Sequence, residues 1–355
     1  MLWKVLLGLG AVCTVFFAAT PPGHYLAKGA WTEAHILAAR EPIDRVVADT
    51  TVDRATRDKL QLVRAARDYA QNTLGLRAKQ SFTTYAKTPS DTLVLVLSVA
   101  YRDRLALRTW WWPVVGRVPY KGFFDFAQAR REQADYDRDG FDTDLRPSSA
   151  FSTLGWFNDP LLSTTLRADS TYLVETVIHE LLHNTVWINS DAAFNESFAN
   201  FVGMQGALAF FRERGDSVLT RRAVRNRAVS RTIGRFYSDA FHSLDSAFSA
   251  HPADSGRAAR LAARDSVLAA ARERLVHDVA PALGIADTMW ARRVPLNIAS
   301  VLARRVYRDD VDDFDTLLVA SGGDLRAAIT RIADVARAAP TGTAFGAMER
   351  AARRR

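Results

Sequence analysis

The chain has 355 residues, of which 48% are hydrophobic and 24% charged, as in an ordinary folded protein. These totals exclude a disordered chain and a multi-span membrane protein, and the single cysteine, Cys13, excludes an intrachain disulfide. The net charge is +8, and only six of the 47 basic residues are lysine. Because the arginines are spread over most of the chain, we interpret this charge as a compositional bias and expect no nucleic-acid partner. Only residues 221–235 and the terminal arginines are gathered as such a partner would require.

Residues 5–19 form a continuous apolar stretch behind Lys4. Its length fits the apolar region of a signal peptide and is short for a membrane span. Bulky residues stand where a signal peptidase prefers small ones, and a valine precedes the cysteine where a lipoprotein signal has a small residue. We therefore expect residues 1–20 to be an uncleaved anchor in the inner membrane of a bacterial envelope, with the rest of the chain in the periplasm. A cleaved signal, which would leave a soluble periplasmic protein, and a buried amino-terminal helix are the alternatives.

Both helices and strands are expected in the first half of the chain. Apolar residues at helical spacing predict an amphipathic helix over 53–74, which stops at Gly75. Continuous leucine- and valine-rich sequence predicts a buried strand over 91–101, and glycine and proline interrupt a second, bent strand over 114–124. The polar, acidic stretch 130–146 is expected to be a loop or a helix end. Its spaced aspartates resemble a calcium-binding loop, but the glutamate of the twelfth position is missing.

The second half of the chain is helical in pattern after a short strand and turn within 151–164. Helices are predicted over 171–188, 193–214, 218–248, 257–277 and 296–306. Since there are no repeats and no long linker, we expect residues 21–355 to form a single α+β domain that is predominantly α-helical. The expected parts are a small sheet at roughly 91–157, a helical hairpin over 171–214 and a helical carboxyl-terminal part over 216–355.

The sequence HELLH at 179–183 places two histidines four residues apart on a helix. Residues at this spacing lie one above the other, so the imidazoles of His179 and His183 can reach one ion. Glu180 is turned about 100° away, which keeps it off the ion but lets it accept a proton from a water bound there. Zinc suits the arrangement, because imidazole is a good zinc ligand and three protein ligands leave a fourth position for water. We therefore expect one zinc ion per chain, with water as the nucleophile.

Glu196, in the sequence FNESF, is the expected third ligand. A third histidine in an extended motif is excluded, because valine and asparagine stand at the positions that such a motif requires. A turn with Asp191 as a helix cap would fold a second helix back beside the first and put Glu196 in its first turn. Asn200, one helical turn further on, is expected to hold the spare ring nitrogen of one of the two histidines. If Glu196 is not the ligand, Asp191 and His242 are the next candidates.

The alternative to a metal site is a buried helix with structural histidines. The helix predicted over 171–188 is apolar over most of its circumference, and a buried helix can hold one hydrogen-bonded histidine. Two histidines and a glutamate are harder to bury without a partner, because each side chain loses its hydration. The pattern therefore favours the metal site.

Several motifs together resemble known proteins. HELLH followed by NESFA resembles the gluzincin metallopeptidases, whose zinc ligands are two histidines and the glutamate of an NE motif on the next helix. The motifs HYLAKGA, PVVGRVPYKGFFD, FSTLGWFNDPLLST, HELLHNTVW, FNESFANFVG and LNIASVLARRVY follow one another as in the bacterial family of predicted aminopeptidases, over nearly the whole chain. The resemblance implies a zincin-like domain and a peptide substrate. It also implies three zinc ligands and a general base: His179, His183, Glu196 and, as the base, Glu180.

The chain departs from the better-known gluzincins in two ways. Only twelve residues separate His183 from Glu196, which implies a tight helical hairpin. The GAMEN strand that holds the amino terminus of a substrate in aminopeptidase N-like enzymes is missing upstream, and we interpret GAMER at 346–350 as a coincidence.

The resemblance also suggests residues for two further tasks. Stabilising the oxyanion would fall to Tyr307 or Tyr120, and binding the ammonium group of the substrate to Asp159. As structural alternatives, the tyrosines are core aromatics and the aspartate is a cap or turn residue beside Pro160. The edge strand that aligns a peptide is expected in one of two segments, 149–155 or 114–124.

Two functions of other classes stay open. A metal-binding scaffold without activity would keep the fold and the ion, but the intact Glu180 argues against it. A basic protein that holds anionic lipid or nucleic acid would use residues 221–235.

Overall fold

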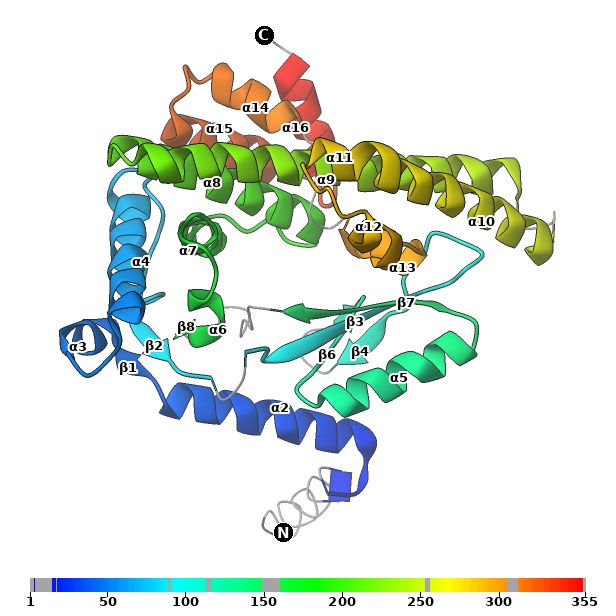
Figure 1. Ribbon diagram of the computed structural model, residues 1–355, viewed down its shortest axis with the longest axis horizontal. Coiled ribbons are helices and arrows are strands. Elements are labelled where there is room, and N and C mark those ends of the chain that lie inside the picture. Colours follow the sequence, from blue (N-terminus) through cyan, green and yellow to red (C-terminus); the bar gives the residue numbers. More distant parts are fainter. Residues whose placement is uncertain are drawn as a thin grey trace.

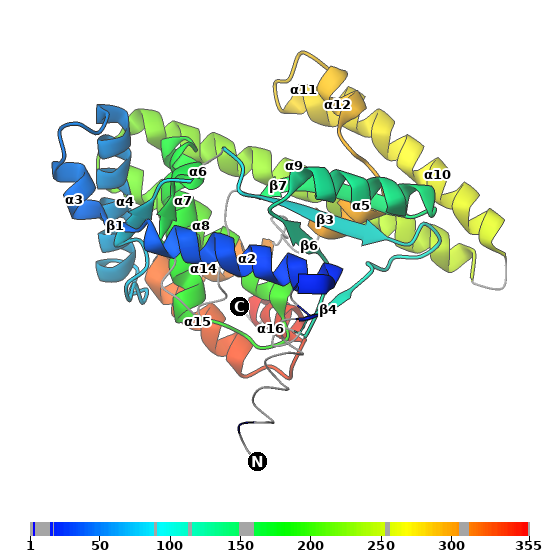
Figure 2. The same cartoon turned by 90° about the horizontal axis from the view of Figure 1, so that it is seen from below.

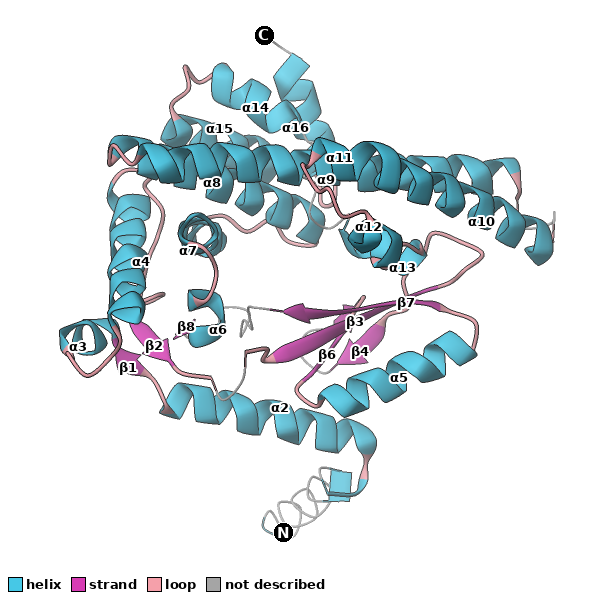
Figure 3. Cartoon of the chain, in the orientation of Figure 1, coloured by secondary structure: helices cyan, strands magenta, loops and turns pink. Residues whose placement is uncertain are grey.

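A computed structural model describes residues 3, 15–16, 18–88, 91–112, 116–148, 160–252, 256–304 and 312–353. Helices dominate these ranges and the sheets are small, which confirms the expected predominantly helical α+β class (Figures 1 and 3). No helix within them is long and apolar enough to cross a membrane. Residues 4–14, most of the expected anchor, lie outside the described ranges.

The amino-terminal part is mainly helical. It comprises α2 (Pro21–Ala38), β1 (Glu41–Pro42), α3 (Ile43–Ala48), α4 (Arg54–Asn72) and β2 (Thr84–Ala86). The helix predicted over 53–74 is confirmed as α4, whose cap Asp53 accepts a hydrogen bond from the backbone of Thr56. Its buried face carries four apolar residues at helical spacing: Leu60, Val63, Ala66 and Ala70. Helix α2, which the sequence did not predict, lies on the side of the molecule away from α9 (Figures 1 and 2).

Short strands and two helices follow. They are β3 (Val94–Ala100), β4 (Trp110–Trp112), β5 (Gly116–Val118), β6 (Lys121–Phe123), α5 (Phe126–Arg138), β7 (Asp142–Ser148), β8 (Leu161–Leu162) and α6 (Ser163–Leu166). The strand predicted over 91–101 is confirmed as β3. The bent strand predicted over 114–124 is instead two strands of different sheets. The helix end allowed for 130–146 is confirmed, since α5 ends at Arg138, but the strand β7 that follows was not predicted.

The described strands form separate small sheets rather than the single one expected. The orders are β6-β3-β7, β1-β2-β8 and β4-β5. In the first sheet β3 is central and antiparallel to both neighbours. Leu95, Leu97 and Val99 of β3 pack with residues of α5, so this helix covers one face of the sheet. The opposite face is turned toward α9 and α13 (Figure 1).

The rest of the described chain is helical. Its elements are α7 (Ser170–Thr185), α8 (Ala192–Glu213), α9 (Ser217–Ala250), α10 (Arg257–Arg274), the π-helical turn η2 (Leu275–Val279), α11 (Ala280–Ala282), α12 (Met289–Arg293), α13 (Ile298–Arg304), α14 (Asp312–Val319), α15 (Leu325–Arg337) and α16 (Ala344–Arg353). All five predicted helices are present, with ends shifted by a few residues. The GAMER segment lies in α16, where Met348 is buried and Glu349 pairs with Arg353. These structural roles agree with the interpretation that its likeness to GAMEN is accidental.

The largest apolar cluster joins α4, α7 and α8 to the carboxyl-terminal helices. The ring of Phe314 on α14 stacks on Phe198 and Phe201 of α8, with centroids 5.6 and 5.2 Å away. Phe194, in the first turn of α8, also contacts the rings of Phe314 and Phe345, so the carboxyl-terminal helices cover one side of α8 from its first turn onward.

A buried carboxylate ties the sheet to the helices. Asp142, at the start of β7, is 3% exposed and pairs with Arg102 and with Arg264 of α10. It also accepts the backbone N–H of Ile298, the first residue of α13, at 2.9 Å. These bonds leave no room for the calcium loop considered for this stretch, because arginines occupy the carboxylate.

We predict that Asp142→Asn destabilises the fold by about 3–5 kcal/mol, because the guanidinium of Arg264 loses its buried counter-charge and keeps only the exposed Asp265. Chemical denaturation would measure the loss. Asp135→Asn is the control, because both side chains of its pair with Arg138 are more than half exposed. It should change the free energy of unfolding by less than about 1 kcal/mol. Equal effects of the two substitutions would contradict the role given to Asp142.

Candidate metal centre

Helix α7 carries both histidines of HELLH. It begins at Asp169, whose carboxylate accepts the backbone N–H groups of Thr171 and Tyr172. Its apolar residues are buried around most of the circumference, so the helix is fixed in the core as the sequence predicted. The helix ends at Thr185, three residues earlier than predicted, and His183 therefore lies in its last turn.

A short turn returns the chain to α8. The buried side chain of Asn195 donates to the carbonyl of Ile188 at 2.8 Å and accepts its N–H at 2.9 Å, which closes the turn. Asp191 caps α8, as predicted, by accepting the N–H of Phe194. These bonds start the second helix early enough to put Glu196 in its second turn, beside the histidines.

Two glycines of α8 let the helices approach closely. A Cβ atom on Gly203 would lie 2.8 Å from the carbonyl oxygen of Glu175 and 3.4 Å from the Cβ of His179. One on Gly206 would lie 2.9 Å from a methyl carbon of Ile178. A larger residue at Gly203 would have to move α8 away from the backbone of α7, whereas one at Gly206 would have to displace the side chains of Ile178 and Leu74.

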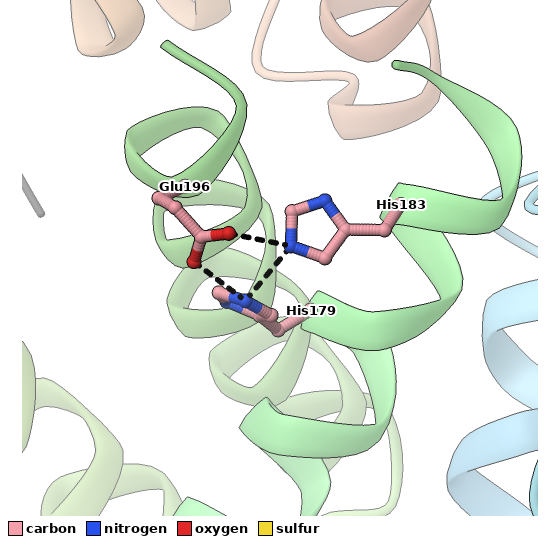
Figure 4. A group of neighbouring side chains, drawn as sticks. All are labelled: His179, His183 and Glu196. Atoms are coloured by element: carbon pink, nitrogen blue, oxygen red, sulfur yellow. Dashed lines mark hydrogen bonds and ion pairs between the residues drawn. The ribbon is translucent and has the colours of Figure 1, made fainter. Parts of the chain in front are cut away.

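His179, His183 and Glu196 meet between the two helices (Figure 4). The two Nε2 atoms are 3.2 Å apart, and the carboxylate oxygens of Glu196 lie 3.6 Å from Nε2 of His179 and 3.4 Å from Nε2 of His183. Ligands about 2.1 Å from a tetrahedral ion are separated by about 3.4 Å, and these three separations are of that size, with each histidine facing a different oxygen of Glu196. The donor set of two imidazoles and one carboxylate also fits zinc. This group can therefore hold a metal ion.

The charges around the group act differently on the two imidazoles. Burial lowers the pKa of His179, but the interaction with Glu196 and the charges of Glu180, Glu196 and Glu175 outweigh it, so the pKa is raised. Burial and the neighbouring His179 lower the pKa of His183 to about 4, despite the opposite effect of Glu196. His183 is thus a neutral ligand at physiological pH, whereas a metal ion must displace a proton from His179 more often.

The structure also locates the other residues that the sequence singled out. Glu180 lies near enough for its charge to act on His179, as a base beside the ion would. The pKa of Tyr120, directly before β6, is raised by partial burial and by the charge of Glu196, although 47% of the residue is exposed. Asp159 and Tyr307 lie outside the described residues.

One expected contact is corrected. The Nδ1 atom of His183 is buried and has no hydrogen-bond partner among the described residues. Asn200 therefore does not hold this nitrogen. A contact of Asn200 with His179 stays a prediction. The two reserve ligands are not in the group: Asp191 caps α8, and His242 lies on α9.

Sequence reasoning missed three residues of the site. Glu175, one turn before His179, adds a third carboxylate charge to the group. The ring of Trp187 lies 5.5 Å from that of His183, edge to face, and 53% of the residue is exposed. Asn195 closes the turn. The helical spacing of Glu175 and His179 could have revealed the first, but nothing local distinguishes the other two.

The basic run at 221–235 is partly neutralised. Arg227 and Arg231 pair with Asp315, and Arg231 and Arg235 pair with Asp312. These arginines join α9 to α14, so the run has a structural use that weakens its interpretation as an anion-binding surface.

The fold and the site define a predominantly helical α+β protein with a His-His-Glu group suited to a metal ion. The family model described as "Putative aminopeptidase" matches residues 24–343. The chain therefore belongs to this family, as the motifs implied, and the description points to a peptidase. No curated protein and no solved structure matches the chain.

We predict that Gly203→Ala lowers metal affinity by about 10- to 100-fold, the range found when support of the ligands is lost. The added methyl group forces α8 away from α7 and should also cost about 1–3 kcal/mol of stability. Metal titration and chemical denaturation would measure the two effects.

Gly346→Ala is the matched control. It adds a methyl group to a glycine of α16 whose nearest neighbour would be the flexible end of Arg350 at 3.4 Å. It should leave metal affinity unchanged and stability equal or slightly higher. Unchanged metal affinity in Gly203→Ala would show that the helix spacing does not determine the site.

Proposed function

We propose that the protein is a zinc-dependent peptidase of the gluzincin type, and an aminopeptidase in its cleavage mode. The observation that carries the proposal is the convergence of three side chains next to Glu180. The Nε2 atoms of His179 and His183 are 3.2 Å apart, and each has a carboxylate oxygen of Glu196 within 3.6 Å. The family description supports a peptidase. His179, His183 and Glu196 would hold the ion, one per chain.

When bound, zinc would supply the Lewis acidity that activates a water molecule and polarises the peptide carbonyl. Glu180 accepts the proton of that water as the general base and later delivers it to the leaving amine. Trp187 and the apolar wall of α7 limit access of bulk water to the histidines, which strengthens these charge interactions.

The oxyanion requires a donor close to the ion. Tyr120 is the described candidate, because the charge of Glu196 acts on its phenol and the raised pKa keeps it protonated as a donor. Tyr307 and Asp159 keep their proposed roles in oxyanion and ammonium binding on the family resemblance alone. For peptide alignment, the edge strand β6 lies within the expected segment 114–124.

The proposed location follows from the sequence. Residues 1–20 would anchor the protein to the inner membrane, or be cleaved as a signal, and the peptidase would act in the periplasm.

We predict different outcomes for the two glutamates. Glu196→Ala removes a ligand and should lower the bound zinc well below one per chain. Glu180→Gln keeps the size and polarity of the side chain but cannot accept a proton, so zinc should stay near one per chain while peptide hydrolysis falls by about 10²- to 10⁴-fold. Metal analysis and peptidase assays of both variants would test this.

Glu213→Ala, at the far end of α8, is the control and should retain metal and activity. Loss of zinc in Glu180→Gln, or full zinc and turnover in Glu196→Ala, would show that the roles are wrongly assigned. If Glu180→Gln binds zinc and the wild type cleaves no peptide, the result would instead favour a metal-binding scaffold without activity.

Cleavage mode gives a separate prediction. An aminopeptidase binds the ammonium group of its substrate through a charge-assisted contact, so acetylation of that group should reduce kcat/KM by roughly tenfold or more. The measurement compares a peptide with its acetylated form. Equal rates on the two would identify an endopeptidase.

A further inference from the structure

A second charged group lies on β7, on the face of the sheet turned toward the helices. Leu145 packs with the α5 cluster, and alternate residues of a strand point to opposite faces. Asp144 and Arg146 therefore lie on the other face, opposite Ser98 and Val96 of β3.

The group consists of two arginines on one buried carboxylate. Asp144 is 3% exposed, and its Oδ2 lies 3.2 Å from Arg146 and 3.7 Å from Arg304 at the end of α13. The guanidinium of Arg304 also lies over the ring of Tyr237, 4.8 Å from its centroid. The two side chains are each 32% exposed, so both are held in place yet reachable from solvent. Two positive charges on one negative charge leave an excess of one.

The position of this group relative to the metal centre follows from two observations. The carboxyl-terminal end of β7, which carries Arg146, points toward α7 and α8 (Figures 1 and 2). Tyr120, directly before β6, is within electrostatic range of both sites, because the charge of Glu196 raises the pKa of its phenol and the charge of Arg146 lowers it. A peptide with its reacting bond at the metal ligands can thus extend past Tyr120 toward the arginines, since each residue spans about 3.3–3.6 Å.

We propose that Arg146 and Arg304, positioned by Asp144, bind a carboxylate of the peptide substrate. The inference rests on the proposed peptidase function. Guanidinium groups match the planar geometry of a carboxylate and form paired hydrogen bonds with it. That carboxylate is either the free carboxyl terminus of a short peptide or an acidic side chain, and both sources make the site specific for anionic substrates.

The test uses the zinc-loaded full chain and three probes: Ala-Ala-Ala, its carboxyl-terminal amide, and the amide of Ala-Glu-Ala. The expected kcat/KM of the wild type is about 10- to 100-fold higher for at least one carboxylate-bearing probe than for the amide of Ala-Ala-Ala. Preference for Ala-Ala-Ala identifies the terminal carboxylate, and preference for the amide of Ala-Glu-Ala identifies the side chain. In Arg146→Gln and in Arg304→Gln, the ratio of kcat/KM for the preferred probe to kcat/KM for the amide of Ala-Ala-Ala should fall toward one. Zinc content and hydrolysis of the amide of Ala-Ala-Ala should stay as in the wild type.

Arg102→Gln is the matched control. Arg102 is also one of two arginines on a buried aspartate of β7, but that aspartate, Asp142, lies at the other end of the strand. This variant should keep the wild-type preference. Equal rates of the wild type on all three probes, or equal losses on all three in Arg146→Gln, would overturn the inference and leave the peptidase function standing.

Equilibrium binding separates this inference from the proposed function. Calorimetric titration of zinc-loaded Glu180→Gln with the same probes requires no turnover. Tighter binding of a carboxylate-bearing probe, lost on adding Arg146→Gln, would support the carboxylate site even if the wild type cleaves none of the peptides. Equal binding of all probes, or no binding of any, would overturn it.

Discussion

The close contact between α7 and α8 is the constraint on which the site depends. Two imidazoles on one helix can converge on a point, but the carboxylate must come from another element. Gly203 and Gly206 allow the backbones to approach until Glu196 lies within 3.6 Å of both Nε2 atoms. At this distance the two imidazoles and the carboxylate can together hold a metal ion.

The remaining elements hold this contact in place. Phe314 and the carboxyl-terminal helices cover the side of α8 that faces away from the histidines, and Asn195 closes the turn that joins the two helices. On the other side, Asp142 ties β7 to α10 and α13. The sheet is thereby oriented with one apolar face on α5 and one charged face toward the helices. That charged face carries the residues with which a substrate could be selected.

The predictions from sequence succeeded where local spacing carries the information. Helix α4 was predicted from apolar residues at helical spacing, and strand β3 from a continuous leucine- and valine-rich run. Within 130–146 the helix end was expected, but the strand β7 was missed for a physical reason. The residues of β7 that face the helices are charged, so the strand has no apolar alternation, and it is stable because arginines distant in sequence neutralise Asp142 and Asp144. No pattern within the strand reveals those partners.

The sequence by itself determined the kinds of metal ligand and the order in which they occur, because the four-residue spacing of HELLH places both imidazoles on one helical face whatever surrounds them. It also determined that a second helix follows with a glutamate in its first turns. Only the tertiary structure decided that Glu196 reaches the histidines, that the spare nitrogen of His183 has no partner among the described residues, and that Arg146 and Arg304 share Asp144. These contacts depend on how closely separate elements pack, and packing distances are set by side chains far apart in the chain.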